Sequence, residues 1–205
     1  MIQIEREDVE VDEISNYLTE DLRTEINHGI EVSRLAGMLA RELKLESELC
    51  HDIEIAGVLH DIGKLRVSTY LYGGAEDTLN VEKMRYVRMH ATLGYEVVKQ
   101  EGYPDRVCEI ILHHHENYDG TGYPSNLVGN NIPIGARILR ICDVFVALTS
   151  DRPYRKAFDC KTAMELLIEE VRHFDMKIFL AFQSIAHGEI EAKKMKRDVQ
   201  DKLVY

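Results

Sequence analysis

The chain has 205 residues, of which 45% are hydrophobic and 30% charged, a composition typical of one folded domain rather than a disordered segment. Its net charge of −11 makes polymeric nucleic acid a poor partner for the surface as a whole, although a local basic patch could hold a small phosphate ligand. Four widely spaced cysteines argue against disulfides or a thiolate zinc site and fit a cytoplasmic protein, and no apolar run predicts a membrane span or signal peptide.

An acidic lead-in over residues 1–20 precedes one predicted domain over residues 21–205. Residues 1–21 carry eight acidic side chains and one basic one, which indicates a solvated segment, with an edge strand or a linker remnant as alternatives. Near the other end, Lys193, Lys194, Lys196 and Arg197 are predicted to form a solvated helix face, with a dimer contact as the less favoured interpretation. The oligomeric state stays open, with a homodimer as one alternative.

Apolar residues recur at helical spacing through most of the chain, and we expect an all-α helical bundle. No segment shows convincing strand alternation, and all four prolines lie between residues 104 and 153. Five stripes each include one polar residue: His28 with Val32, Leu35, Leu39 and Leu43; His60 with Ile53 and Gly57; His90 with Val87, Gly94 and Val97; His114 with Val107 and Ile111; and Asp143 with Ala136, Leu139 and Ala147. Residues 160–172 and 176–197 are also predicted to be helical.

Two glycine-containing loops interrupt the helices, one over residues 66–79 and one over residues 117–133. The second is long for a compact domain, and long ordered loops are often functional. It follows directly after His113-His114-His115-Glu116, so we expect it to form a wall of an active site.

The polar residues of the five stripes are predicted to point into the core together. One inward histidine is usually a satisfied core residue, but several from different helices indicate a metal site in the bundle. Asp143 supports this interpretation because a buried carboxylate needs a cation or strong donors, with Arg137 or Arg140 as the alternative partner. Mixed imidazole and carboxylate ligands favour Fe, Mn, Ni or Zn over Mg or Ca.

Two pairs of neighbouring residues suggest more than one ion. Successive helical residues point about 100° apart, so the members of His60-Asp61 and of His114-His115 are expected to serve two neighbouring ions, with Asp61 able to bridge. The remaining histidines are predicted to lie on the surface or around the site, with His113 pointing away: His51, His113, His173 and His187.

Four ordered motifs resemble a known family. Leu59-His60-Asp61-Ile62-Gly63-Lys64 resembles the signature of HD-superfamily metal phosphohydrolases. The segment from His114-His115-Glu116 to Gly122-Tyr123-Pro124 resembles the hallmark of the HD-GYP subfamily. The stretch from Ile132-Pro133 to Arg152-Pro153-Tyr154-Arg155, and His173-Phe174-Asp175, match the same subfamily, so the resemblance covers residues 25–185.

The resemblance implies a helical bundle that binds two or three metals and hydrolyses cyclic di-GMP. It implies seven ligands, with Asp61 bridging: His28, His60, Asp61, His90, His114, His115 and Asp143. The glutamate associated with a third metal is replaced by Thr24, and Glu25, one residue later, is expected to point elsewhere. We therefore expect two divalent ions, iron or manganese.

Three basic residues are implied to contact the substrate. Lys64 would meet a phosphate oxygen, and it shares the catalytic role with Asp61. Arg152 and Arg155 would hold the other phosphate, and the basic residues of segment 151–161 fit that role. The alternative is that Arg152 or Arg155 caps a helix C-terminus or pairs with Asp151.

The expected activity is hydrolysis of cyclic di-GMP to linear pGpG, GMP or both, by a hydroxide that bridges two metals. One alternative is another cyclic dinucleotide, such as cyclic GMP-AMP. A non-catalytic signalling module is the other, and the complete ligand set disfavours it. A diguanylate cyclase or a sensor domain is the kind of protein partner that this function suggests.

Overall fold

The computed structural model describes residues 9–66, 81–152 and 155–188. Side chains are described from residue 22 onward in the helix that begins at Val9, and from residue 87 onward in the helix that begins at Val81. The elements are α1 (Val9–Glu42), α2 (Ser47–Leu59), α4 (Val81–Gln100), α5 (Asp105–His113), α6 (Ile134–Thr149) and α7 (Cys160–Glu169), with short 3-10 helices η1 (Gly129–Asn131) and η2 (Val171–His173). Residues 176–188 are also helical. Within these ranges the only β pairing is one antiparallel bridge between Arg152 and Arg155, so the all-α prediction is confirmed.

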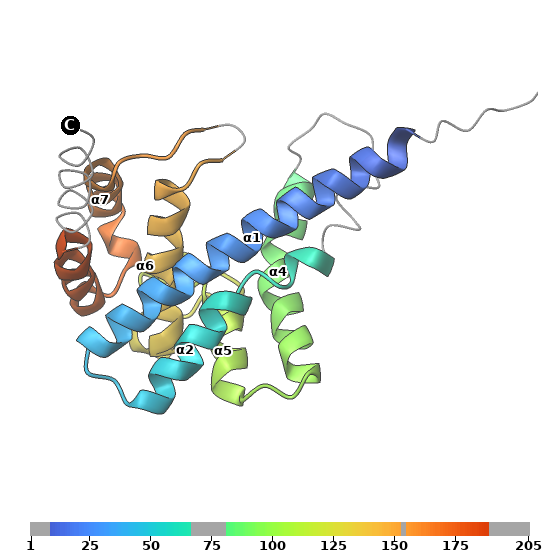
Figure 1. Cartoon of the computed structure of the whole chain (residues 1–205). Coiled ribbons are helices and arrows are strands. Elements are labelled where there is room, and N and C mark those ends of the chain that lie inside the picture. Colours follow the sequence, from blue (N-terminus) through green and yellow to red (C-terminus); the bar gives the residue numbers. More distant parts are fainter. Residues whose placement is uncertain (1–8, 67–80, 153–154, 189–205) are drawn as a thin grey trace, which may run out of the picture.

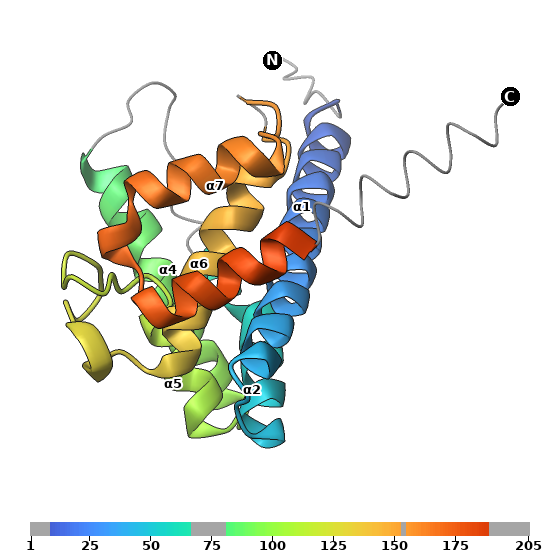
Figure 2. The same ribbon diagram turned by 90° about the vertical axis from the view of Figure 1, so that its left-hand side faces the viewer.

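Helix α6 lies at the centre of the bundle. The long α1 crosses the molecule and packs along α2 and α6, while α4 pairs with α5, which also contacts α2 (Figure 1). In Figure 2, α7 and residues 176–188 lie over the other side of α6. The ring of Phe182 packs edge-on against Phe145 of α6, with 5.1 Å between centroids.

The apolar stripes form the core as predicted, with one exception in α4. Leu39 of α1, Ile53 of α2, Ile111 of α5 and Leu139 of α6 are buried in one cluster. The α4 stripe was expected to include Val87, but this side chain is 41% exposed. The buried positions of α4 are His90, Ala91, Gly94 and Val98, because these residues, three or four apart, share one face of a helix.

Residues 9–20 of the acidic lead-in form the first turns of α1, and one expectation about a later helix is corrected. Helix α7 ends at Glu169 and is followed by η2, whereas residues 160–172 were expected to be one helix. Residues 1–8, residues 67–79 of the first predicted loop and the basic run at 193–197 lie outside the described residues.

No helix in the described ranges is long and apolar enough to cross a membrane. All four cysteines are free thiols, as the absence of paired spacing predicts.

The end of α2 packs directly against α4 at Gly63. A Cβ on residue 63 would lie 2.0 Å from the carbonyl oxygen of His90 and 2.6 Å from the nitrogen of Gly94. The two segments approach this closely only because residue 63 has no side chain. This contact places the His60-Asp61 turn beside His90.

Candidate metal centre

The seven predicted ligands converge from α1, α4, α6 and the ends of α2 and α5. Their ligand atoms form three overlapping groups, in each of which all atoms lie within 4.8 Å of one another. The groups are His90, His114 and His115; His28, His60 and Asp143; and His60, Asp61 and His114. The structure therefore brings all seven residues into one continuous cluster, and no other described residue belongs to such a group.

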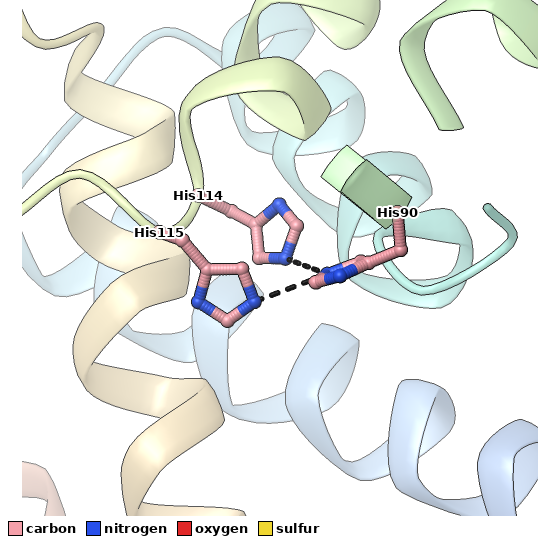
Figure 3. A group of neighbouring side chains, drawn as sticks. All are labelled: His90, His114 and His115. Carbon is pink, nitrogen blue, oxygen red and sulfur yellow. Dashed lines mark hydrogen bonds between the residues drawn. The ribbon is translucent and has the colours of Figure 1, made fainter. Parts of the chain in front are cut away.

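Three histidines from α4 and the end of α5 point toward one another (Figure 3). The Nε2 atom of His90 lies 3.2 Å from Nε2 of His114 and 3.1 Å from Nε2 of His115. The neighbours His114 and His115 thus meet in one group, although helical geometry predicts divergent directions. The pair lies just beyond α5, which ends at His113, and both side chains reach Nε2 of His90 from there.

Hydrogen bonds to the backbone fix which nitrogen of three buried rings faces the cluster. The Nδ1 atoms of His60, His90 and His114 lie 2.9, 2.5 and 2.6 Å from the carbonyl oxygens of Gly57, Val87 and Ile111. A carbonyl only accepts, so each Nδ1 carries the proton in the neutral ring. The Nε2 atoms then present lone pairs to one another, and Nε2 of His60 is buried without a hydrogen-bond partner in the described structure.

Asp61 lies at the centre of the cluster. Its Oδ2 is 3.2 Å from Nε2 of His60 and 4.0 Å from Nε2 of His28, and its Oδ1 is 3.4 Å from Nε2 of His90. Asp143 approaches from α6, with Oδ1 2.9 Å from Nε2 of His28 and 3.8 Å from Nε2 of His60. Asp61 thus reaches histidines from two of the groups, which is the position a bridging carboxylate needs.

Three of the rings, those of His90, His114 and His115, are held in the neutral form that metal coordination requires. Burial lowers the pKa of His90 and, more strongly, of His114, and it lowers the pKa of His115 to about 3. Burial also opposes protonation of His60, but Asp61 and Asp143 raise the pKa of this ring well above its usual value. The unprotonated nitrogens of His90, His114 and His115, and the two carboxylates that favour a positive charge beside His60, fit divalent metal ions as the cations between them.

Lys64 and Glu25 form an ion pair at the edge of the cluster. The Lys64 ammonium donates to Oδ2 of Asp61 at 2.7 Å and to Oε2 of Glu25 at 3.0 Å. The expectation that Glu25 points elsewhere is therefore wrong, because residue 25 precedes His28 by three positions and shares its face of α1. Glu25 nevertheless belongs to none of the three ligand groups.

Asp143 pairs with histidines rather than with the arginines considered from the sequence. Arg137 instead binds Asp175, with 2.6 Å between Nη1 and Oδ2. Arg140 donates from Nε to Oδ1 of Asn117 at 2.9 Å, and no ion pair joins it to Asp143 in the described structure.

Arg155 caps the C-terminus of α6. Its Nη1 donates to the carbonyl oxygens of Leu148 and Lys156 at 3.0 and 2.8 Å, and its Nη2 donates to that of Ala147 at 2.9 Å. This is the capping alternative left open by the sequence, since the last carbonyls of a helix lack partners within the helix. The backbone of Arg152 pairs with that of Arg155, at 2.8 and 3.0 Å. The substrate contacts of both arginines stay predictions.

The loop after α5 is fastened to the cluster, as expected for a wall of the site. Buried Glu116 accepts hydrogen bonds from the backbone N–H groups of Ser125 and Leu127, at 2.6 and 3.1 Å. The loop places the Tyr123 ring on the ring of His115, with 4.8 Å between centroids and 26° between planes. Gly122 is required there, because a Cβ would lie 2.2 Å from the nitrogen of Asn117.

Sequence reasoning assigned no role to Glu116, Arg88 or Asn117, since their contacts form only when the loop folds back onto α4 and α6. The guanidinium carbon of Arg88 lies 5.3 Å from the centroid of the Tyr123 ring. The remaining histidines lie outside the ligand groups. His113 is buried rather than directed to solvent, between Glu109 and Glu116, at 3.3 and 3.7 Å.

Comparison with known proteins agrees with this geometry. The sequence profile of the HD domain family matches residues 12–178. The chain is 37% identical over 156 residues to the cyclic di-GMP phosphodiesterase PA4108 of Pseudomonas aeruginosa, a match that covers 76% of this chain and 37% of that protein. It is 34% identical over 154 residues to 3'3'-cGAMP-specific phosphodiesterase 1 of Vibrio cholerae, covering 74% of this chain and 36% of the relative.

The matched region thus spans little more than a third of either relative. Among solved structures, the HDG"Y"P protein Bd1817 of Bdellovibrio bacteriovorus aligns with a TM-score of 0.62 at 20% identity, covering 78% of this chain and 52% of that one. This likeness concerns the fold, and it confirms the helical bundle predicted from the sequence.

Proposed function

Since the chain belongs to the HD domain family, we propose that it is a metal-dependent phosphodiesterase that opens the ring of cyclic di-GMP. The observation that carries the proposal is the convergence of His28, His60, Asp61, His90, His114, His115 and Asp143 as facing lone pairs and carboxylates. The resemblance of the motifs to HD-GYP proteins, and the relative from Pseudomonas aeruginosa named as a cyclic di-GMP phosphodiesterase, support the choice of substrate.

In this proposal the seven residues would hold two divalent ions, iron or manganese, and Asp61, which lies close to histidines of more than one group, would be the shared carboxylate. Two such ions would supply Lewis acidity and an activated water at neutral pH. Without them, an anionic phosphodiester resists attack by water. The backbone bonds of His60, His90 and His114 orient the rings before any metal binds, because each Nδ1–H is already committed to a carbonyl.

Lys64 acts on the substrate from the edge of the cluster. It stabilises the negative charge that develops on a phosphate oxygen and assists the departing 3′-oxygen. Burial opposes its charge, but Asp61 and Glu25 raise the pKa of Lys64, so the ammonium stays protonated at neutral pH. Glu25 also keeps the ammonium beside Asp61.

A second candidate substrate is cyclic GMP-AMP, because a relative of comparable identity is named as specific for it. Both molecules contain two phosphodiesters, so the metal centre would treat them alike, and discrimination would depend on contacts to the second base. Cytoplasmic action, and a diguanylate cyclase or sensor domain as protein partner, belong to the same proposal.

The test is chromatography of the products formed from each dinucleotide by protein purified without oxygen and loaded with iron or manganese. We expect linear pGpG or GMP from cyclic di-GMP, and a loss of at least about 100-fold in Asp61→Asn, since even groups that only support metal ligands contribute 10- to 100-fold. Asp52→Asn is the matched control, because Asp52 is a buried carboxylate that pairs with Arg106 at 2.8 Å, outside the cluster.

Consumption of neither dinucleotide by the metal-loaded protein would contradict the proposed activity. Binding of cyclic di-GMP without product would then favour the non-catalytic signalling module.

A further inference from the structure

Arg140 is a half-buried cation that forms no ion pair among the described residues, although Asp143 and Glu170 favour its charge from farther away. It lies on α6, one turn before Asp143, and its Nε donates to Oδ1 of Asn117 at 2.9 Å. Asn117 is itself held by Thr121, with 3.0 Å between Nδ2 and Oγ1. Among the described residues, the two terminal NH₂ groups of Arg140 have no acceptor and no carboxylate lies within ion-pair distance. The guanidinium is thus oriented by one bond, with its other donors uncommitted.

Arg140 binds the loop that stacks Tyr123 on His115, through Asn117, whose backbone nitrogen would lie 2.2 Å from a Cβ on Gly122. The positive charge of Arg140 acts on both His115 and Tyr123. It lowers the pKa of Tyr123, but burial has the larger effect and raises this pKa to about 12. Arg88 of α4 approaches the same tyrosine, with its guanidinium carbon 5.3 Å from the ring centroid. Two guanidinium groups from different helices therefore contact one loop, Arg88 at Tyr123 and Arg140 at Asn117, and this loop packs on the predicted metal ligand His115.

The charges on the two sides of the cluster differ. On the Lys64 side, the ammonium is offset by Asp61 and Glu25. On the His115 side, Arg88 and Arg140 have no carboxylate partner in the described structure. In a chain with a net charge of −11, two unpaired arginines beside a metal centre favour an anionic ligand.

We propose that Arg140 and Arg88 form a second phosphate subsite, which holds the phosphodiester of a cyclic dinucleotide that is not being cleaved. The subsite rests on the proposed function, because a cyclic dinucleotide brings two phosphates and the metal centre takes one. The resemblance implies Arg152 and Arg155 for this phosphate, but Arg155 commits its guanidinium to carbonyls at the end of α6, and the backbone of Arg152 pairs with that of Arg155. Arg140 has uncommitted donors that can form the paired hydrogen bonds a phosphate accepts.

The experiment compares two substrates of the metal-loaded enzyme: cyclic di-GMP, with two phosphates, and bis(p-nitrophenyl) phosphate, with one. Arg140→Met should raise the KM for cyclic di-GMP about 10- to 100-fold, the loss typical of hydrogen bonds to a charged group. Turnover of the one-phosphate diester should stay within about twofold, because it needs no second subsite. Arg140→Lys should restore part of the affinity for cyclic di-GMP, and Arg88→Met should show a smaller rise in KM.

Arg137→Met is the matched control, because Arg137 lies on the same helix and pairs with Asp175. It should lower the unfolding temperature and leave the ratio of the two activities unchanged. An unchanged KM in Arg140→Met, or an equal loss on both substrates, would overturn the subsite while wild-type turnover upheld the proposed function. A wild-type enzyme that cleaves the one-phosphate diester but no cyclic dinucleotide would contradict the proposed function and the subsite together.

Discussion

Single side chains set the chemistry of the cluster through partners that are close in sequence. His60, His90 and His114 each bond to the carbonyl of the residue three positions earlier, so the helix that carries each ring also fixes its tautomer. Asp61 reaches the cluster and Lys64 together, at 2.7 Å from the ammonium. The ligand geometry is therefore preorganised by local hydrogen bonds rather than by long-range contacts alone.

A substitution of Arg155 distinguishes a contact to the substrate, which the resemblance implies, from a role in stabilising the fold. Because its guanidinium satisfies the last carbonyls of α6, we expect Arg155→Ala to lower the free energy of unfolding by about 1–3 kcal/mol. Urea denaturation measures this change. Unchanged stability together with a higher KM for cyclic di-GMP would instead show a substrate contact.

His115 makes the stability of the metal-free protein depend on pH. Burial lowers its pKa to about 3, whereas an unfolded histidine titrates near about 6.5. Between these pH values His115 binds a proton in the unfolded chain but not in the folded protein. The free energy of unfolding therefore falls as the pH decreases from about 6.5 toward about 3.

The measurement is urea denaturation of metal-free wild type and His115→Gln at several pH values in that interval. We expect the wild type to lose more stability than the variant on acidification, because the variant lacks the group that titrates. Parallel curves for the two proteins would contradict the lowered pKa of His115.

At the scale of elements, close approach between the end of α2 and the middle of α4 assembles the site. Gly63→Ala should destabilise the protein and lower its metal content, because the added Cβ would lie 2.0 Å from the carbonyl oxygen of His90. Gly188→Ala is the matched control, since a Cβ there meets nothing within 4 Å. Differential scanning fluorimetry and metal analysis report both effects, and a Gly63→Ala protein as stable as the control would refute the close contact.

Helical periodicity predicts the elements and the inward direction of His28, His60, His90, His114 and Asp143 because each lies in or directly beside a regular helix. It fails where helices end. His114 and His115, just beyond the end of α5, meet in one group because both side chains reach His90 of α4. The positions of Glu25 and Arg140 depend on contacts between segments far apart in the chain, and that of Glu116 on the fold of its own loop, neither of which spacing along one helix encodes.

At the scale of the whole molecule, five segments contribute ligands to one cluster, and α6 joins that cluster to the core. Figure 1 shows how α1, α2, α4, α5 and α6 are arranged, and buried apolar residues of these helices form one core cluster. Bound metal would therefore connect segments from residue 28 to residue 143, and its binding free energy would add to the stability of the fold.

The most direct test of the metal centre is the metal content of protein purified without oxygen and supplied with iron or manganese. We predict two ions per chain in the wild type and a clear loss of bound metal in His60→Ala, because Nε2 of His60 is buried and lies close to Asp61 and Asp143. Asp52→Asn should retain both ions. A wild type that holds no metal above background, or a His60→Ala protein that holds as much metal as the wild type, would contradict a metal centre at this cluster.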